Sequence, residues 1–259
     1  MKSLTTLLLA LTGVTTIGCV ATVGGNECSS ERCADDDGSG SATARDCSDE
    51  SKVKTVKKNL TIDSDSDLDS LPTEANGCWA LDGILRIESD KVTSLEKLGD
   101  LVNVNDIEIV DTKLAALDFV QEQVEVFGHV RVQGNAKLTS LSPLRASRYT
   151  GTVSEDFVPF YVIDNNAELT TIGGLKYLTE STDQLTFSNN PKLTSIELPE
   201  LTKVTGTGTF QVTGNGITTL TVSSLATVTS IDISQNPQLT NVSGLRVTLI
   251  TGGIQFKNN

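Results

Sequence analysis

Histidine, aromatic residues and basic residues are all scarce in this sequence. One histidine stands among 259 residues, aromatic side chains make up 4%, and 20 Lys and Arg residues oppose 33 Asp and Glu, for a net charge of −13. Duplex binding requires clustered positive charge to neutralise phosphates, and single strands are usually held on aromatic side chains. The shortages therefore argue against nucleic acid as a partner. They also give no basis for predicting a metal or cofactor site.

Long apolar runs are missing as well, except at the amino terminus. Met1 and Lys2 are followed by a mostly apolar stretch from Leu4 to Ile17. As a helix this stretch spans about 21 Å, whereas a bilayer core is about 30 Å thick. A short apolar run behind a basic residue is typical of a signal peptide. We therefore assign residues 1–18 to a signal peptide and expect the mature chain to be secreted.

The predicted cleavage region ends in a cysteine. The segment from Thr16 to Cys19 resembles the lipobox of bacterial lipoproteins, because the small residue Gly18 precedes the cysteine. Thr16 departs from that pattern, in which leucine is usual, and ordinary cleavage after Ala21 is the alternative. The resemblance implies a lipid on Cys19 that anchors the protein in the membrane. Val20 resembles the residue that directs such proteins to the outer membrane.

Four further cysteines form an even set, which suits an oxidising compartment. Three pairings are open among Cys28, Cys33, Cys47 and Cys78. We favour a Cys28–Cys33 disulfide that closes a local loop and a Cys47–Cys78 disulfide that fastens the start of the folded domain. Their spacings of 5, 14 and 31 residues match no common zinc pattern, so no metal is predicted there.

Residues 19–50 contain many Gly, Ser and Asp residues and almost no large apolar side chains. Such a segment buries too little apolar surface to fold by itself. We predict a disordered acidic tether that holds the domain away from the membrane. The folded domain is then expected over residues 51–259, beginning with a capping coil at 51–80.

The domain sequence repeats one short pattern. Each copy has an apolar-x-apolar strand and a turn position three residues later, which is often Asn. Regular repeats at this period indicate a solenoid, in which each coil is stable only against its neighbours. The period is 21–25 residues with one interval of 31, because the second apolar position of the nine copies falls at 62, 87, 109, 132, 163, 187, 212, 233 and 256.

Asparagine occupies the turn position in six copies. Its amide can bond the backbone of a turn, and asparagine tolerates left-handed backbone angles. We predict a structural asparagine ladder between successive coils, pointing inward rather than forming a ligand site. Its members are Asn135, Asn166, Asn190, Asn215, Asn236 and Asn259.

These residues carry a resemblance to two related families. The spacing Leu-x-Ile-x-x-Asn-x-x-Leu is similar to leucine-rich repeats. The segment from Cys78 to Ile87 resembles the opening of receptor L-domains, and Leu60–Ile62 resembles part of the capping coil found before it in bacterial surface lipoproteins. The resemblance covers about residues 47–259. It implies a right-handed, mostly β solenoid of about nine coils, used for recognition and without an active site.

The central residue of each apolar-x-apolar strand is expected to point outward. In three successive copies it is Arg86, Glu108 and Arg131, which predicts a row of alternating charge. This row is either a surface salt-bridge ladder or a binding face. No two neighbouring copies carry carboxylates there, so the acidic pair of a carbohydrate-active enzyme is not predicted.

The 31-residue interval contains an insertion within residues 145–157. Insertions in solenoids emerge as loops, often on the binding face. Arg148, Tyr149 and Phe157 belong to residue types that are enriched at interaction hot spots. A variable loop without a role is the alternative.

Together these features predict a lipid-anchored envelope protein with a non-catalytic solenoid for recognition or adhesion, whose ligand is a protein or a glycan. One alternative is a structural envelope component without a specific ligand. The other is a carbohydrate-active β-helix enzyme.

Overall fold

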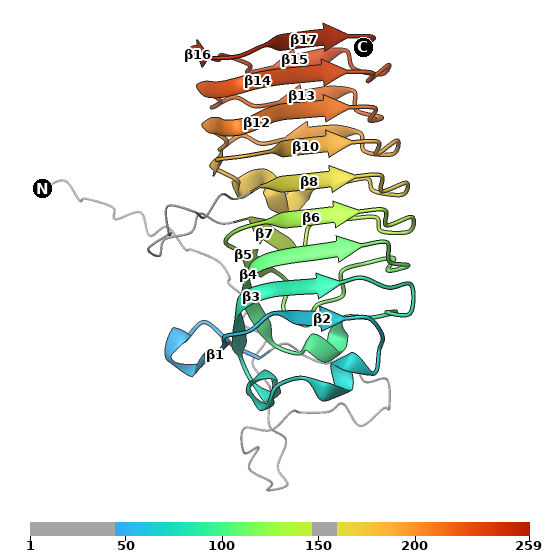
Figure 1. Ribbon diagram of the computed structural model, residues 1–259, viewed down its shortest axis with the longest axis vertical. Helices are drawn as coiled ribbons and strands as arrows, with labels where there is room; N and C mark the ends of the chain where they lie inside the picture. The colour runs from blue at the N-terminus through green and yellow to red at the C-terminus, as the bar shows by residue number, and fades with distance from the viewer. Residues whose placement is uncertain (1–44, 147–159) are drawn as a thin grey trace, which may run out of the picture.

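Stacked parallel strands form most of the regular structure (Figure 1). The computed structural model describes residues 45–146 and 160–259, and within these ranges the helices are short 3-10 turns. Neighbouring strands pair in parallel along the whole stack. The predicted mostly β solenoid is therefore confirmed, with about eight turns of chain.

The elements follow one another at the period of the sequence repeat. The strands are β1 (Lys54–Val56), β2 (Leu60–Ile62), β3 (Trp79–Ile87), β4 (Leu101–Val110), β5 (Val124–Val126), β6 (Val130–Gln133), β7 (Leu144–Ala146), β8 (Tyr161–Asp164), β9 (Glu180–Ser181), β10 (Leu185–Ser188), β11 (Ser195–Glu197), β12 (Lys203–Thr213), β13 (Thr219–Thr221), β14 (Thr227–Ser234), β15 (Asn241–Ser243), β16 (Leu249–Ile250) and β17 (Ile254–Lys257). The 3-10 turns are η1 (Glu50–Lys52), η2 (Asp67–Ser70), η3 (Thr73–Asn76), η4 (Glu96–Leu98) and η5 (Gly173–Tyr177).

The nine apolar-x-apolar segments lie side by side in one sheet, which we call the front face. It runs from β2 through β3, β4, β6, β8, β10, β12 and β14 to β17 (Figure 1). The pairing register aligns every predicted second apolar position, as in Ile62 with Ile87 and Phe187 with Val212. Because strand side chains alternate, the flanking apolar residues enter the core and the central residue faces outward. Eight intervals between nine strands account for the eight turns.

The core is a continuous stack of aliphatic rows with a few aromatic rings. Ile87, Phe187 and Phe210 are fully buried, and so is Trp79 at the amino-terminal end of the stack. Each buried row packs against the row of the next coil, so every inner coil shares one apolar interface with the coil before it and one with the coil after it. This arrangement explains why one repeat cannot be stable alone.

The turn after each front strand from β4 onward contains a left-handed residue. This residue directly precedes the ladder position, so the expected left-handed role belongs to its neighbour and not to the ladder asparagine itself. Asn, Gly, Asp or Gln fills the place, in keeping with the residues that adopt positive φ most readily. They are Asp111, Gly134, Asn165, Asn189, Gly214, Gln235 and Asn258.

A bend in β3 separates the front face from a second sheet region, which consists of β1, the first half of β3, the first part of β4, and β5. The register between β3 and β4 shifts between Leu81 and Ile84. Gly83 lies at this shift, where a Cβ atom would stand 2.3 Å from the backbone oxygen of Lys58. A side chain does not fit there, and glycine allows the preceding coil to approach. The first half of β3 then pairs with β1 and β4 beyond the bend.

Candidate recognition site

The outward row of the front face contains the three predicted charged residues. The register places Arg86 beside Glu108 and Glu108 beside Arg131. Arg86 Nη2 lies 2.7 Å from Glu108 Oε2. Arg131 instead donates from Nε and Nη2 to Gln133 Oε1 on its own strand, at 3.0 and 2.6 Å. The three side chains are thus in register, and the short ion pair joins the first two.

This ion pair contributes little to stability. The Arg86 side chain is 43% exposed, and an exposed pair is worth about 0–1 kcal/mol. We expect Arg86→Ala to lower the free energy of unfolding by less than about 1 kcal/mol in urea titrations. Lys192→Ala, which removes a pair with Glu168 in which both partners are more exposed than Arg86 and Glu108, serves as the control. A loss of several kcal/mol would show that Arg86 has a structural role beyond the pair.

The rest of the central row is uncharged apart from one aspartate. After Arg131 it continues through Val162, Thr186, Gln211, Asp232 and Gln255. Asp232 receives a hydrogen bond from Gln255 Nε2 at 3.3 Å and has no carboxylate beside it in the row. Within the described front face, therefore, no two neighbouring strands carry Asp or Glu at the central position.

The single histidine lies at the edge of the same face. His129 donates its backbone N–H to Asp106 Oδ1 at 2.6 Å, and its ring stacks on Phe160 with centroids 4.1 Å apart. Its Nδ1 also lies 3.3 Å from the same aspartate oxygen. These contacts fix the ring between neighbouring coils, which is a structural role.

Three predicted hot-spot residues, Arg148, Tyr149 and Phe157, lie outside the described residues. Arg145, near the start of this segment, has contacts within the described chain. Arg145 lies over the ring of Tyr177 at 4.6 Å, and Lys176 lies over the same ring at 4.9 Å. Arg145 also pairs loosely with Glu125, at 3.7 Å.

The ladder asparagines point into the solenoid. Asn135, Asn166, Asn190 and Asn236 are fully buried, and each bonds to the next member. Thr112 begins the series by donating to Asn135 Oδ1 from its backbone and its hydroxyl. The side-chain amides of this row form their hydrogen bonds within the chain, so the row has a structural role and is not a ligand site.

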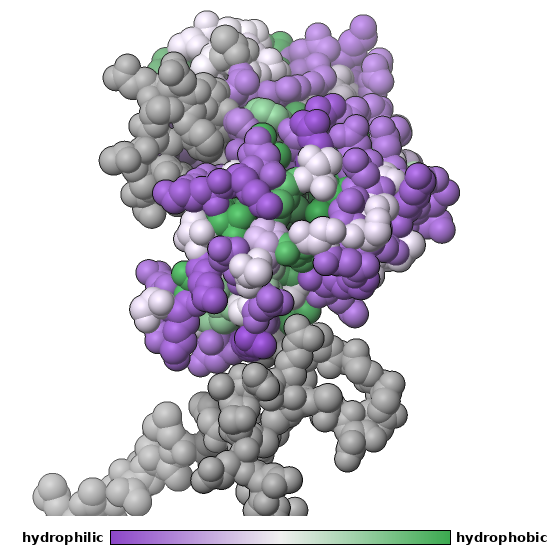
Figure 2. Space-filling view, turned by 60° about the horizontal axis from the view of Figure 1, so that its bottom comes forward, coloured by the Kyte–Doolittle hydropathy of each residue, from purple (hydrophilic) through white to green (hydrophobic). Residues whose placement is uncertain are grey.

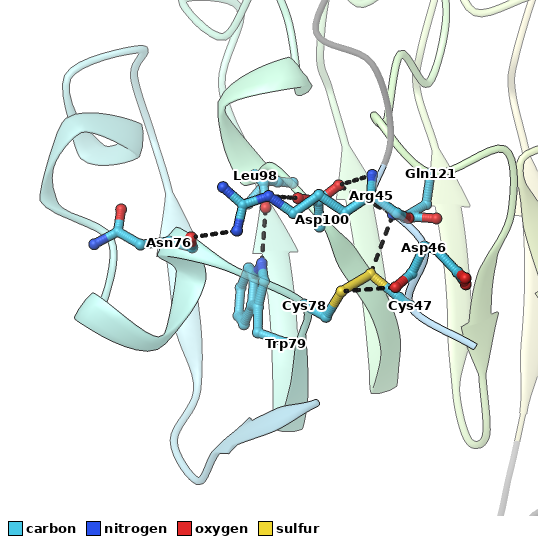
Figure 3. A network of polar contacts seen from close by, with 9 residues as sticks. All are labelled: Arg45, Asp46, Cys47, Asn76, Cys78, Trp79, Leu98, Asp100 and Gln121. Atoms are coloured by element: carbon cyan, nitrogen blue, oxygen red, sulfur yellow. Dashed lines mark hydrogen bonds and ion pairs between the residues drawn. A yellow bond between two sulfur atoms is a disulfide. The ribbon is translucent and has the colours of Figure 1, made fainter. Parts of the chain in front are cut away.

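A network around Cys47 attaches the amino-terminal segment to the first coils (Figure 3). The disulfide Cys47–Cys78 confirms one of the two favoured pairings. Beside it, Arg45 Nε lies 3.4 Å from Asp100 Oδ2, and Gln121 Nε2 donates to Asp100 Oδ1 and to the backbone oxygen of Arg45. We call residues 45–53 the clasp. Cys28 and Cys33, the other favoured pair, and Cys19 lie outside the described residues.

Local hydrogen bonds stabilise the ionised form of two clasp carboxylates. Bonds from the hydroxyl and backbone N–H of Ser48 lower the pKa of Asp46, and those of Ser51 do the same for Asp49. Both residues are exposed.

A groove that sequence reasoning missed lies between the clasp and the second sheet region. Its volume is about 700 Å³, within the range of small-ligand pockets. The clasp lines one side through Cys47 and Ser48, and outward residues of β1, β3, β4 and β5 line the rest. Figure 2 shows polar side chains over most of this end of the molecule, with small apolar patches between them.

Polar side chains are concentrated in the groove. Asn105 Nδ2 donates to Asp82 Oδ1 at 2.6 Å, and Lys57 Nζ lies 3.6 Å from Asp82 Oδ2. Asn103 is in register with Ala80 and makes no side-chain hydrogen bond within the described chain. The 23-residue spacing of Asp82 and Asn105 matches the repeat period, so the sequence alone could have indicated that these two residues lie on neighbouring coils. The spacing could not predict the groove, because one side of the groove is formed by the clasp, which lies outside the repeats.

Among residues 45–146 and 160–259, no cluster of His, Cys, Asp and Glu suits a metal ion. No helix in these ranges is long and apolar enough to cross a membrane. Comparison with known proteins gives no match to a family model, a curated protein or a solved structure. The resemblance to receptor L-domains thus stays a prediction from the sequence, and function must be argued from the solenoid itself.

Proposed function

We propose that this protein is a non-catalytic recognition protein, anchored to the cell envelope by a lipid on Cys19. The anchor is supported by the apolar run from Leu4 to Ile17 and by Gly18 and Cys19, which follow it. The Cys47–Cys78 disulfide is consistent with secretion into an oxidising compartment. The acidic residues 19–50 then serve as the spacer, and Val20 favours the outer membrane as the destination.

The observation that carries the recognition role is the extended, in-register polar surface of the solenoid. Nine front strands align one central residue each, and the charged start of the row is followed by Val162, the buried Thr186, and then Gln211, Asp232 and Gln255. Solenoids use such repeated surfaces for binding. The central row lacks the neighbouring carboxylates that hydrolysis of a glycan requires. Recognition therefore fits this surface better than catalysis.

The anchor is tested on the mature amino terminus. We expect mass spectrometry of the full-length protein expressed in a bacterial host to find residue 19 as the first residue, carrying acyl chains, and the protein in the membrane fraction. Cys19→Ser is the control and should lose the acyl mass. An unmodified terminus at Thr22, produced by cleavage after Ala21, would contradict the anchor.

Recognition is tested separately with the mature protein on lipid vesicles. Purified envelope polysaccharide and purified envelope protein fractions are passed over it in turn, and binding is measured by interferometry. We expect saturable binding to at least one fraction. Absence of saturable binding to every fraction would favour a structural envelope component without a specific ligand.

A further inference from the structure

The groove beside the clasp combines a fixed side with a floor of hydrogen-bonded strands. The disulfide and the Arg45–Asp100 contacts hold the clasp against the first coils. The floor strands β3 and β4 are each paired on both sides, β3 with β1 and β4, and β4 with β3 and β5. A ligand in the groove therefore meets side chains on a rigid backbone, and a pre-ordered site of this kind loses little entropy on binding.

The side chains of the floor suit hydroxyl groups. Asn103, Asn105 and Asp82 each have a planar end group, and an amide both donates and accepts. Asn103 and Asn105 stand on the same strand two residues apart, so both point out of the same face of β4. Asp82 is hydrogen-bonded to Asn105 across the coils. Adjacent planar amides and a carboxylate can bond neighbouring hydroxyls of a sugar ring.

The apolar surface of the groove suits the other side of such a ring. Phe127 is half-buried at the groove, and Ala80 and Val102 also line it. The carbon-bound hydrogens of a pyranose can pack on such apolar surface, while its hydroxyls reach the amides.

The charges of the groove disfavour anionic ligands. Lys57 is the one basic residue among the described residues that line it, and it is paired with Asp82. Glu50 also lines it and adds negative charge. Binding of a phosphate, sulfate or carboxylate relies on available basic groups, which these residues do not supply. The floor strands β3 and β4 are paired on both sides and offer no edge to a peptide strand; the edge strand β1 is only three residues long.

We infer that this groove binds a short neutral glycan of two or three sugar rings, through Asn103, Asn105 and Asp82, with one ring packed against the apolar lining. The inference rests on the proposed recognition function and assigns it a site and a class of ligand. It places the site on the second sheet region, away from the charged row of the front face.

The test is calorimetry on the mature chain in detergent with four neutral trisaccharides: cellotriose, maltotriose, mannotriose and chitotriose. Trigalacturonate is the anionic comparison. We expect at least one neutral trisaccharide to bind with a Kd between micromolar and millimolar, and trigalacturonate to bind at least ten-fold more weakly. The double variant Asn103→Ala/Asn105→Ala should weaken the neutral ligand at least ten-fold.

The matched control is Gln238→Ala/Asn241→Ala, which removes two exposed amides that lie outside both the groove and the central row of the front face. It should bind the neutral ligand like the wild type. Circular dichroism and the unfolding midpoint show whether each variant is folded. Binding lost in this control variant but kept in the Asn103→Ala/Asn105→Ala variant would overturn the groove assignment and leave recognition intact. No binding of any neutral trisaccharide at 5–10 mM (about the weakest useful affinity), or tighter binding of trigalacturonate, would overturn the glycan inference. The envelope-fraction experiment then decides the recognition function independently.

Discussion

Replacing Asn190 by alanine should lower the free energy of unfolding by about 3–5 kcal/mol. This side chain is fully buried in the middle of the ladder. Its Oδ1 accepts from the backbone N–H and from Nδ2 of Asn166, both at 3.1 Å. Its Nδ2 donates to the backbone oxygens of Ile163 and Ser188, at 3.0 and 2.8 Å.

The large effect follows from what the substitution leaves behind. Alanine removes both an acceptor and a donor, so the N–H of Asn166 and the carbonyl of Ile163 stay buried without these partners. Each unsatisfied buried group costs about 1–3 kcal/mol, and the cavity left by the amide adds to this. The lost contacts join three coils, because Asn166, Asn190 and Asn215 belong to successive turns.

Urea unfolding followed by circular dichroism measures the effect, with Asn189→Gly as the control. Asn189 is the neighbouring residue, it is exposed, and its φ of 56° is one that glycine adopts without strain. Its amide makes one exposed bond to Asp164, at 3.1 Å. We expect the control to change stability by no more than about 0.5 kcal/mol. Equal effects of the two variants would mean that the ladder does not stabilise the stack.

The rows of the solenoid were predictable because strand and repeat periods combine. Alternation within each strand decides which side chains point inward, and the repeat period decides which of them stack. Ile62, Ile109 and Phe187 could therefore be assigned to one buried row before any coordinates. A one-residue error in register would have turned that row outward, and the pairing excludes it.

The groove could not be predicted from the same signals. Asp82 and Asn105 lie on strands, but the bend at Gly83 determines that they face the clasp. Residues 45–50 belong, by composition, to the acidic tether, yet Arg45 and Cys47 are held by long-range contacts to Asp100 and Cys78. Composition describes how a segment behaves alone and contains no information on such contacts. The disulfide was one of three pairings that sequence left open.

Removing this disulfide should have the second large effect, confined to the amino-terminal end. The bond closes a loop with a sequence separation of 31, for which the loss of chain entropy on cross-linking is worth about 3–4 kcal/mol. We expect Cys47→Ser/Cys78→Ser to lower the stability of the clasp and the first coil by about this amount. The contacts of Arg45 and Gln121 with Asp100 remain, but partly buried hydrogen bonds of this kind contribute only about 1 kcal/mol each.

Hydrogen exchange distinguishes a local opening from a global one. Amides of the clasp and β1 should exchange faster in the double variant, while those of β10, β12 and β14 should keep their protection, because in a solenoid each coil contacts only its neighbours. Reduction of the wild-type protein should give the same pattern. Since the clasp lines one side of the groove, the variant should also bind the neutral trisaccharide at least ten-fold more weakly. Unchanged protection of residues 45–56 would show that the hydrogen bonds around Asp100 hold the clasp without the covalent link.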